Sequence, residues 1–189
     1  KGSGTRRATM FPEFLNERWW DTPNPLYRES ICQKAGPWSA LRLEEDWEYD
    51  CRIAARGGKL VWVPDFVCEV RAHGGERLSG GSNTDPQRMR TRARSHSLIW
   101  QHGLEAGLPD SAPKSVGNFA RSLFLLARQC GAAGLPKESN DLLTLALTAA
   151  AGGRARKIDM KLYEFLAMCV GWRAAGRLAA WLDQSRGNR

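Results

Sequence analysis

Apolar residues recur at helical spacing through most of the second half of the chain. Over residues 116–130, and again over 142–150, they fall three or four positions apart, which is the period of an amphipathic helix. The glycine- and proline-containing stretch at 131–136 separates them, so the pattern predicts a helical hairpin. A third apolar stripe, between Leu162 and Trp172, predicts one long C-terminal helix.

The first half of the chain mixes a helical pattern with strand-like patterns. Residues 45–56 predict a helix, because acidic residues crowd its first turn and complement the helix dipole. Apolar residues then share one face of this helix, and Gly57-Gly58 ends it. Strands are expected near 59–63 and 66–73, since the first is apolar and the second alternates apolar and polar positions. A shorter helix is predicted to begin at Pro25 or Leu26 and to end near residue 35.

Asp85 and Pro86 predict the start of another helix, which continues to about His102. An aspartate caps the first turn well, and proline suits the first helical position. His96 and His102 are expected on an exposed face and receive no role. The four arginines of this helix alternate, so a solvated basic face is the favoured interpretation and contact with an anionic lipid or acceptor the minority one. They are Arg88, Arg90, Arg92 and Arg94.

Composition narrows the class of partner without selecting one. The chain has 189 residues, of which 42% are hydrophobic and 25% charged, as in an ordinary globular protein. Its net charge of +8 favours anionic partners such as nucleotide diphosphates, nucleic acid or anionic lipids. Five scattered cysteines without C-x-x-C spacing argue against a zinc site and a disulfide framework. They predict a reducing, cytoplasmic setting.

Three short motifs follow one another between about residues 19 and 80. Each alone is a weak signal, but the ordered set resembles the acidic and C-terminal histidine motifs of family 2 glycosyltransferases. The motifs are Pro25-Leu26-Tyr27-Arg28 with Gly36-Pro37-Trp38, then Glu45-Asp46-Trp47 leading to Val63-Pro64-Asp65, and finally Val70-Arg71-Ala72-His73.

The resemblance implies an α/β fold: the C-terminal part of a GT-A domain, followed by an all-α region. Residues 1–84 would form the partial GT-A domain, 85–112 a connecting helix, and 113–189 the helical hairpin plus the long C-terminal helix. The family's first half binds the nucleotide and supplies an Asp-x-Asp metal motif, which this chain lacks. The chain is therefore expected to be a fragment that is inactive alone.

The resemblance also assigns roles to individual residues. Asp46 would be the base that takes the proton of the acceptor hydroxyl, Glu45 would orient the motif, and Asp46 is expected to face a cleft. His73 would meet a divalent metal, Mn or Mg, or the diphosphate across the same cleft. The main carboxylate ligands of that metal are expected outside this chain. Four residues are assigned to substrate binding, namely Trp38, Arg28, Arg71 and Arg77. Core packing is an equally good interpretation of Trp38.

The favoured function is inverting transfer of a sugar from a nucleotide-diphosphate donor to a glycan, lipid or protein hydroxyl. The alternative is a basic helical module that binds protein or nucleic acid. No nucleic-acid motif occurs and the aromatic residues do not interleave with the arginines, so no nucleic-acid partner is predicted. The C-terminal stripe, with Arg173, Arg177, Trp172 and Trp181, is amphipathic. Burial is favoured for it, and peripheral membrane contact stays open.

Overall fold

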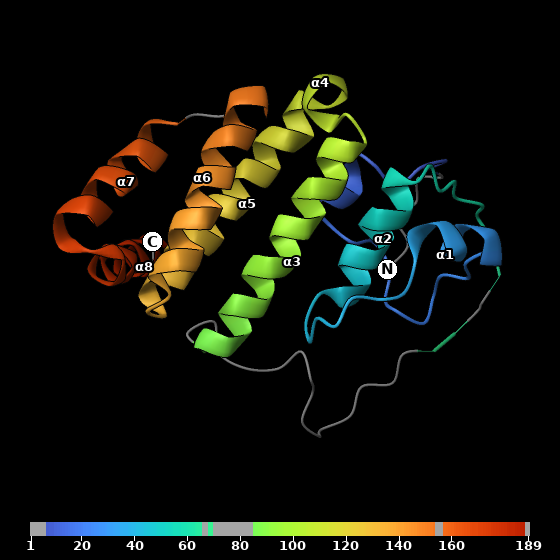
Figure 1. Ribbon diagram of the computed structural model, residues 1–189, viewed down its shortest axis with the longest axis horizontal. Helices are drawn as coiled ribbons and strands as arrows, with labels where there is room; N and C mark the ends of the chain where they lie inside the picture. The colour runs from blue at the N-terminus through green and yellow to red at the C-terminus, as the bar shows by residue number, and fades with distance from the viewer. Residues whose placement is uncertain (1–6, 66–67, 70–84, 154–156, 188–189) are drawn as a thin grey trace.

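The computed structural model describes residues 7–65, 68–69, 85–153 and 157–187. In these ranges the secondary structure is helical, with eight α-helices preceded by a short 3-10 helix (Figure 1). The elements are η1 (Glu13–Leu15), α1 (Glu29–Ala35), α2 (Glu45–Ala55), α3 (Pro86–Glu105), α4 (Leu108–Ser111), α5 (Pro113–Ala132), α6 (Pro136–Gly153), α7 (Ile158–Val170) and α8 (Trp172–Gly187).

The expectation of an α/β GT-A domain is wrong: the residues that the structure describes form an all-α fold. Where a strand is predicted at 59–63, the described chain has one isolated antiparallel bridge, between Thr9 and Lys59. Val61 is 82% exposed. A strand needs a neighbouring strand to satisfy its backbone N–H and C=O groups. The strand predicted at 66–73 lies mostly outside the described residues.

The helix starts were predicted correctly where a local signal marks them. Helix α2 begins at Glu45, and α3 begins at Pro86, where the Asp85 carboxylate accepts a hydrogen bond from the Gln87 N–H at 3.0 Å. The predicted hairpin is formed by α5 and α6. Helix α1 begins later than predicted, at Glu29, and the residues just before it adopt irregular conformations.

The predicted long C-terminal helix is instead two helices, α7 and α8. Gly171 breaks the pattern with a φ of 84°, a left-handed conformation that glycine adopts without the steric cost of a Cβ. Its N–H still bonds to the Ala167 carbonyl at 2.9 Å, which closes the last turn of α7. The chain therefore turns sharply, and α8 returns to pack against α5.

Helix α3 connects the two halves of the molecule. It packs against α2 on one side and against α5 and α6 on the other (Figure 1). One continuous apolar core runs from Met10 to Ala179 and extends across the boundaries predicted near residues 84 and 112. No described helix is both long and apolar enough to span a bilayer.

Candidate functional site

The first turn of α2 follows a strained residue. Glu44 has a φ of 60° and a ψ of 18°, a left-handed conformation that costs a non-glycine residue about 1–3 kcal/mol. Helix α3 holds it there, because Arg92 Nε donates to Glu44 Oε1 at 2.9 Å and His96 Nδ1 lies 3.1 Å from Glu44 Oε2. Burial alone would raise the pKa of Glu44, but His96 and Arg92 outweigh it and lower that pKa.

Asp46, the predicted base, lies in this first turn with its side chain 21% exposed. Its Oδ2 accepts hydrogen bonds from Arg18 Nη1 at 2.8 Å and from the Thr22 hydroxyl at 2.5 Å. Its Oδ1 accepts the Trp47 backbone N–H at 2.7 Å. A carboxylate oxygen has two lone pairs, so Oδ1 keeps capacity for one more donor. The side chain is therefore oriented but not enclosed.

Asp50 lies one helical turn further along and is fully buried. Its Oδ2 accepts Arg18 Nε at 2.7 Å and Trp20 Nε1 at 3.0 Å, and its Oδ1 accepts the Tyr27 hydroxyl. Burial raises the pKa of Asp50, although hydrogen bonds from Tyr27 and Arg18 oppose this shift. Burial and the neighbouring Asp50 raise the pKa of Tyr27 far above its ordinary value, so Tyr27 remains a hydrogen-bond donor.

Arg18 joins the two carboxylates into one cluster. Its guanidinium spans Asp46 and Asp50, and its side chain is only 12% exposed. One positive charge thus faces two carboxylates, which leaves the cluster with a net charge of about −1 when both are ionised. Arg18 Nη2 is buried and has no acceptor among the described residues.

A second buried carboxylate links α2 to α3. Glu48 Oε1 lies 2.8 Å from His102 Nε2, and Glu48 accepts hydrogen bonds from both Arg52 Nε and Arg52 Nη2. Burial alone would raise the pKa of Glu48, but hydrogen bonds from His102 and Arg52 lower it. Both His96 and His102 are buried, so the prediction that they lie on an exposed face was wrong.

The Glu48 and Glu44 pKa shifts predict acid sensitivity. A carboxyl whose pKa is lower in the folded state stabilises the fold above its ordinary pKa, about 4.3, and this stabilisation is lost as the pH falls through the folded-state value. We expect Glu48→Gln to flatten the decline in urea midpoint between pH 5 and pH 3. The exposed Glu17→Gln variant is the matched control. An unchanged slope in Glu48→Gln would contradict the assignment.

The other residues assigned by sequence are more scattered. Glu45 is partly exposed beside Asp46, and Arg28 is exposed just before α1. Trp38 stacks on Tyr49, with ring centroids 4.8 Å apart, and is 44% exposed. One face of the indole is therefore packed. His73, Arg71 and Arg77 lie outside the described residues. The expected approach of His73 to Asp46 therefore stays a prediction.

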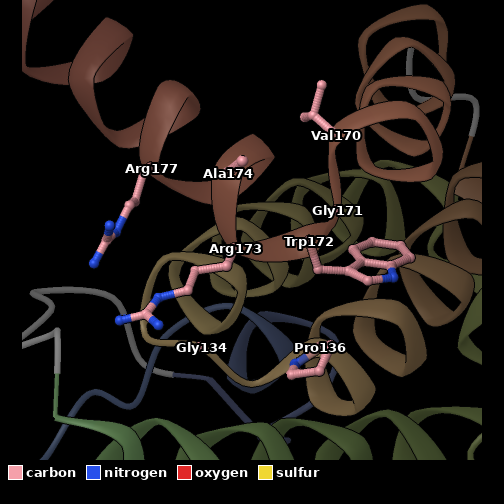
Figure 2. Close-up of a pocket in the computed structure, with 8 residues that line it drawn as sticks. All are labelled: Gly134, Pro136, Val170, Gly171, Trp172, Arg173, Ala174 and Arg177. Carbon is pink, nitrogen blue, oxygen red and sulfur yellow. The ribbon is translucent and has the colours of Figure 1, made fainter.

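Two cavities lie elsewhere in the structure. One, of about 660 Å³, is lined by the start of α8 and the turn between α5 and α6 (Figure 2). The other, of about 430 Å³, lies between residues 9–12, residues 57–59 and the region around α4. Asp46 lines neither of them, so the expectation of a cleft at Asp46 has no support from these two cavities. Among the described residues, no group of His, Cys, Asp or Glu side chains is arranged to hold a metal.

Sequence reasoning missed the partners of Asp46. Asp50 could have been found, because residues four apart in a helix share a face. Arg18 and Thr22 come from an irregular segment without periodicity, so only the folded chain brings them to α2. Two arginines of the predicted solvated face are also ion-paired, Arg90 with Glu138 and Arg92 with Glu44.

No protein-family model, curated protein or solved structure matches this chain. The geometry of the α2 cluster and the three motifs between residues 19 and 80 are therefore the features that point to a function.

Proposed function

We propose that this chain carries the acceptor side of an inverting, sugar-nucleotide-dependent glycosyltransferase, with Asp46 as the base. The proposal is supported mainly by the position and partial exposure of the Asp46 carboxylate. It lies at a helix start, held by Arg18 and Thr22, yet one-fifth of its surface reaches solvent. A general base needs this combination of fixed orientation and access to the substrate proton.

The proposed reaction is a single displacement. The acceptor hydroxyl attacks the anomeric carbon, its proton passes to Asp46 Oδ1, and the bond from that carbon to the donor diphosphate breaks. Attack from the face opposite the leaving group inverts the configuration. Asp50 also pairs with Arg18 and so offsets the positive charge beside Asp46.

The donor side of the reaction is assigned to groups other than the α2 cluster. A departing diphosphate needs positive charge, which a divalent Mn or Mg ion would supply. The described residues offer no such metal group, so we assign its ligands and the nucleotide site to a partner segment or domain. The five cysteines are free thiols, which supports a reducing compartment.

The test is product stereochemistry. The gene product that carries this chain would be incubated with a panel of nucleotide-diphosphate sugars, Mn²⁺ and candidate acceptors, and the glycoside analysed by NMR. We expect an anomeric configuration opposite to that of the donor, and no turnover by residues 1–189 alone. A product with retained configuration would contradict single displacement with Asp46 as base. Absence of transfer across the panel would count against the transferase class.

A further inference from the structure

The cavity of about 660 Å³ lies at the meeting point of two helix starts. The first turn of α8 forms one wall, and the turn that leads into α6 forms the other (Figure 2). This end of the molecule is far along the helical stack from α2, since α3 and α5 lie between them (Figure 1). The cavity is therefore separate from the Asp46 cluster.

Two exposed arginines give the cavity its charge. Arg173 and Arg177 lie one helical turn apart on α8, and both side chains project to the same side of the helix (Figure 2). The Arg173 guanidinium lies over the α5–α6 turn, with Nε 3.8 Å from the position of a Cβ built on Gly134. None of the described residues that line the cavity carries a carboxylate. Neither arginine forms an ion pair within the described part of the chain, unlike Arg128 with Asp183 nearby.

The backbone adds to this positive potential. The Ala175 N–H is the first to bond within α8, to the Gly171 carbonyl at 3.0 Å. The amides of residues 172–174 therefore precede the first intrahelical bond, and the positive end of the helix dipole lies at the cavity. On its apolar side the cavity is lined by Pro136, Val170 and the half-buried Trp172.

Close helix packing fixes the position of both walls. A Cβ on Gly176 would lie 2.2 Å from the Ala132 nitrogen, and one on Gly131 would lie 2.7 Å from the Trp172 carbonyl oxygen. The backbones of α8 and α5 are thus in direct contact. The two arginines consequently extend from a rigid junction and not from a loop.

We propose that this cavity binds a phosphate ester, with Arg173 and Arg177 holding the phosphate oxygens. A guanidinium is planar, permanently charged and matched to phosphate by paired N–H donors. The volume exceeds that of a phosphate alone, and the apolar wall accommodates the organic group that the phosphate carries. The ester is either a small soluble molecule or a lipid headgroup. The second source is consistent with Leu178 and Trp181, which lie beyond the arginines on α8 and are 44% and 62% exposed.

The first arm of the test is calorimetric titration of the chain with pyrophosphate. Arg173→Gln/Arg177→Gln is expected to weaken binding at least about tenfold, because paired charge-assisted hydrogen bonds are lost. The matched control is Arg42→Gln/Arg94→Gln, which removes the same net charge from two exposed arginines elsewhere. Salt screens any long-range effect of the lost charges, so the control should change the affinity for pyrophosphate by less than about twofold.

The second arm separates the two sources. The same proteins would be sedimented with phosphatidylcholine vesicles that contain or lack phosphatidic acid. Vesicle binding that pyrophosphate displaces, and that the Arg173/Arg177 variant loses, identifies a lipid headgroup. Pyrophosphate binding without vesicle binding indicates a small soluble phosphate compound instead of a lipid headgroup. Equal losses of binding in the two double variants, or no binding of either pyrophosphate or vesicles, would overturn the proposal. Neither outcome bears on the role proposed for Asp46.

Discussion

Replacement of Asp50 by alanine is expected to lower the free energy of unfolding by about 3–5 kcal/mol, the usual range for breaking a buried ion pair. The Asp50 side chain is fully buried and accepts hydrogen bonds from Arg18, Trp20 and Tyr27. Its loss would leave three partly buried donors without their acceptor, and Arg18 would keep only its ion pair with Asp46. Urea unfolding followed by circular dichroism would measure the effect.

Asp21→Ala is the control, because Asp21 is an exposed aspartate from the same region of the chain. It should change stability by less than about 0.5 kcal/mol. The double variant Arg18→Met/Asp50→Leu removes both charges and should be more stable than Asp50→Ala alone. If Asp50→Ala unfolds at the wild-type urea midpoint, the cluster is not buried as described.

Replacement of Gly176 by valine is expected to destabilise the C-terminal helices by about 3 kcal/mol or more, at the upper end of overpacking effects. The position of a Cβ at residue 176 would lie 2.6 Å from the Gly131 carbonyl carbon and 2.8 Å from the Arg128 carbonyl oxygen. These are backbone atoms of α5, which cannot rotate away as a side-chain tip can. Helix α8 would therefore have to move off α5.

Ala174→Val is the control for this change, since Ala174 is exposed on the same helix. It should cost only the β-branched helix propensity, less than about 1 kcal/mol. Thermal unfolding followed by circular dichroism at 222 nm would compare the two variants. Equal melting temperatures for Gly176→Val and wild type would show that α8 does not cross α5 at this glycine.

The sequence predicted elements well where the signal is local. Asp85 and Pro86 mark the start of α3 within two residues, and the acidic turn at Glu45 marks α2. The strand at 59–63 was predicted wrongly, because its apolar character says nothing about whether a partner strand is present. The break at Gly171 was missed, since one glycine within a helical stripe is compatible with either continuation or a turn.

The candidate site was predicted only in part for a similar reason. Asp46 and Glu45 were assigned from a contiguous motif and stay predictions, and Asp50 shares their helix. Arg18, which determines the electrostatics of the cluster, is 28 residues from Asp46 and 32 from Asp50. No periodicity links such positions, so their contact follows only from tertiary packing. His73 stays a prediction, because it lies outside the described residues.

The most direct test of the central claim is the turnover number of the Asp46→Asn variant in the gene product that carries this chain. Asparagine keeps the size of the side chain but cannot accept the acceptor proton as a carboxylate does. We expect kcat to fall about 10²–10⁴-fold, with donor binding changed less than about threefold, because the base acts in the transition state. Asp21→Asn should retain wild-type kcat. A near-normal kcat for Asp46→Asn would contradict the account.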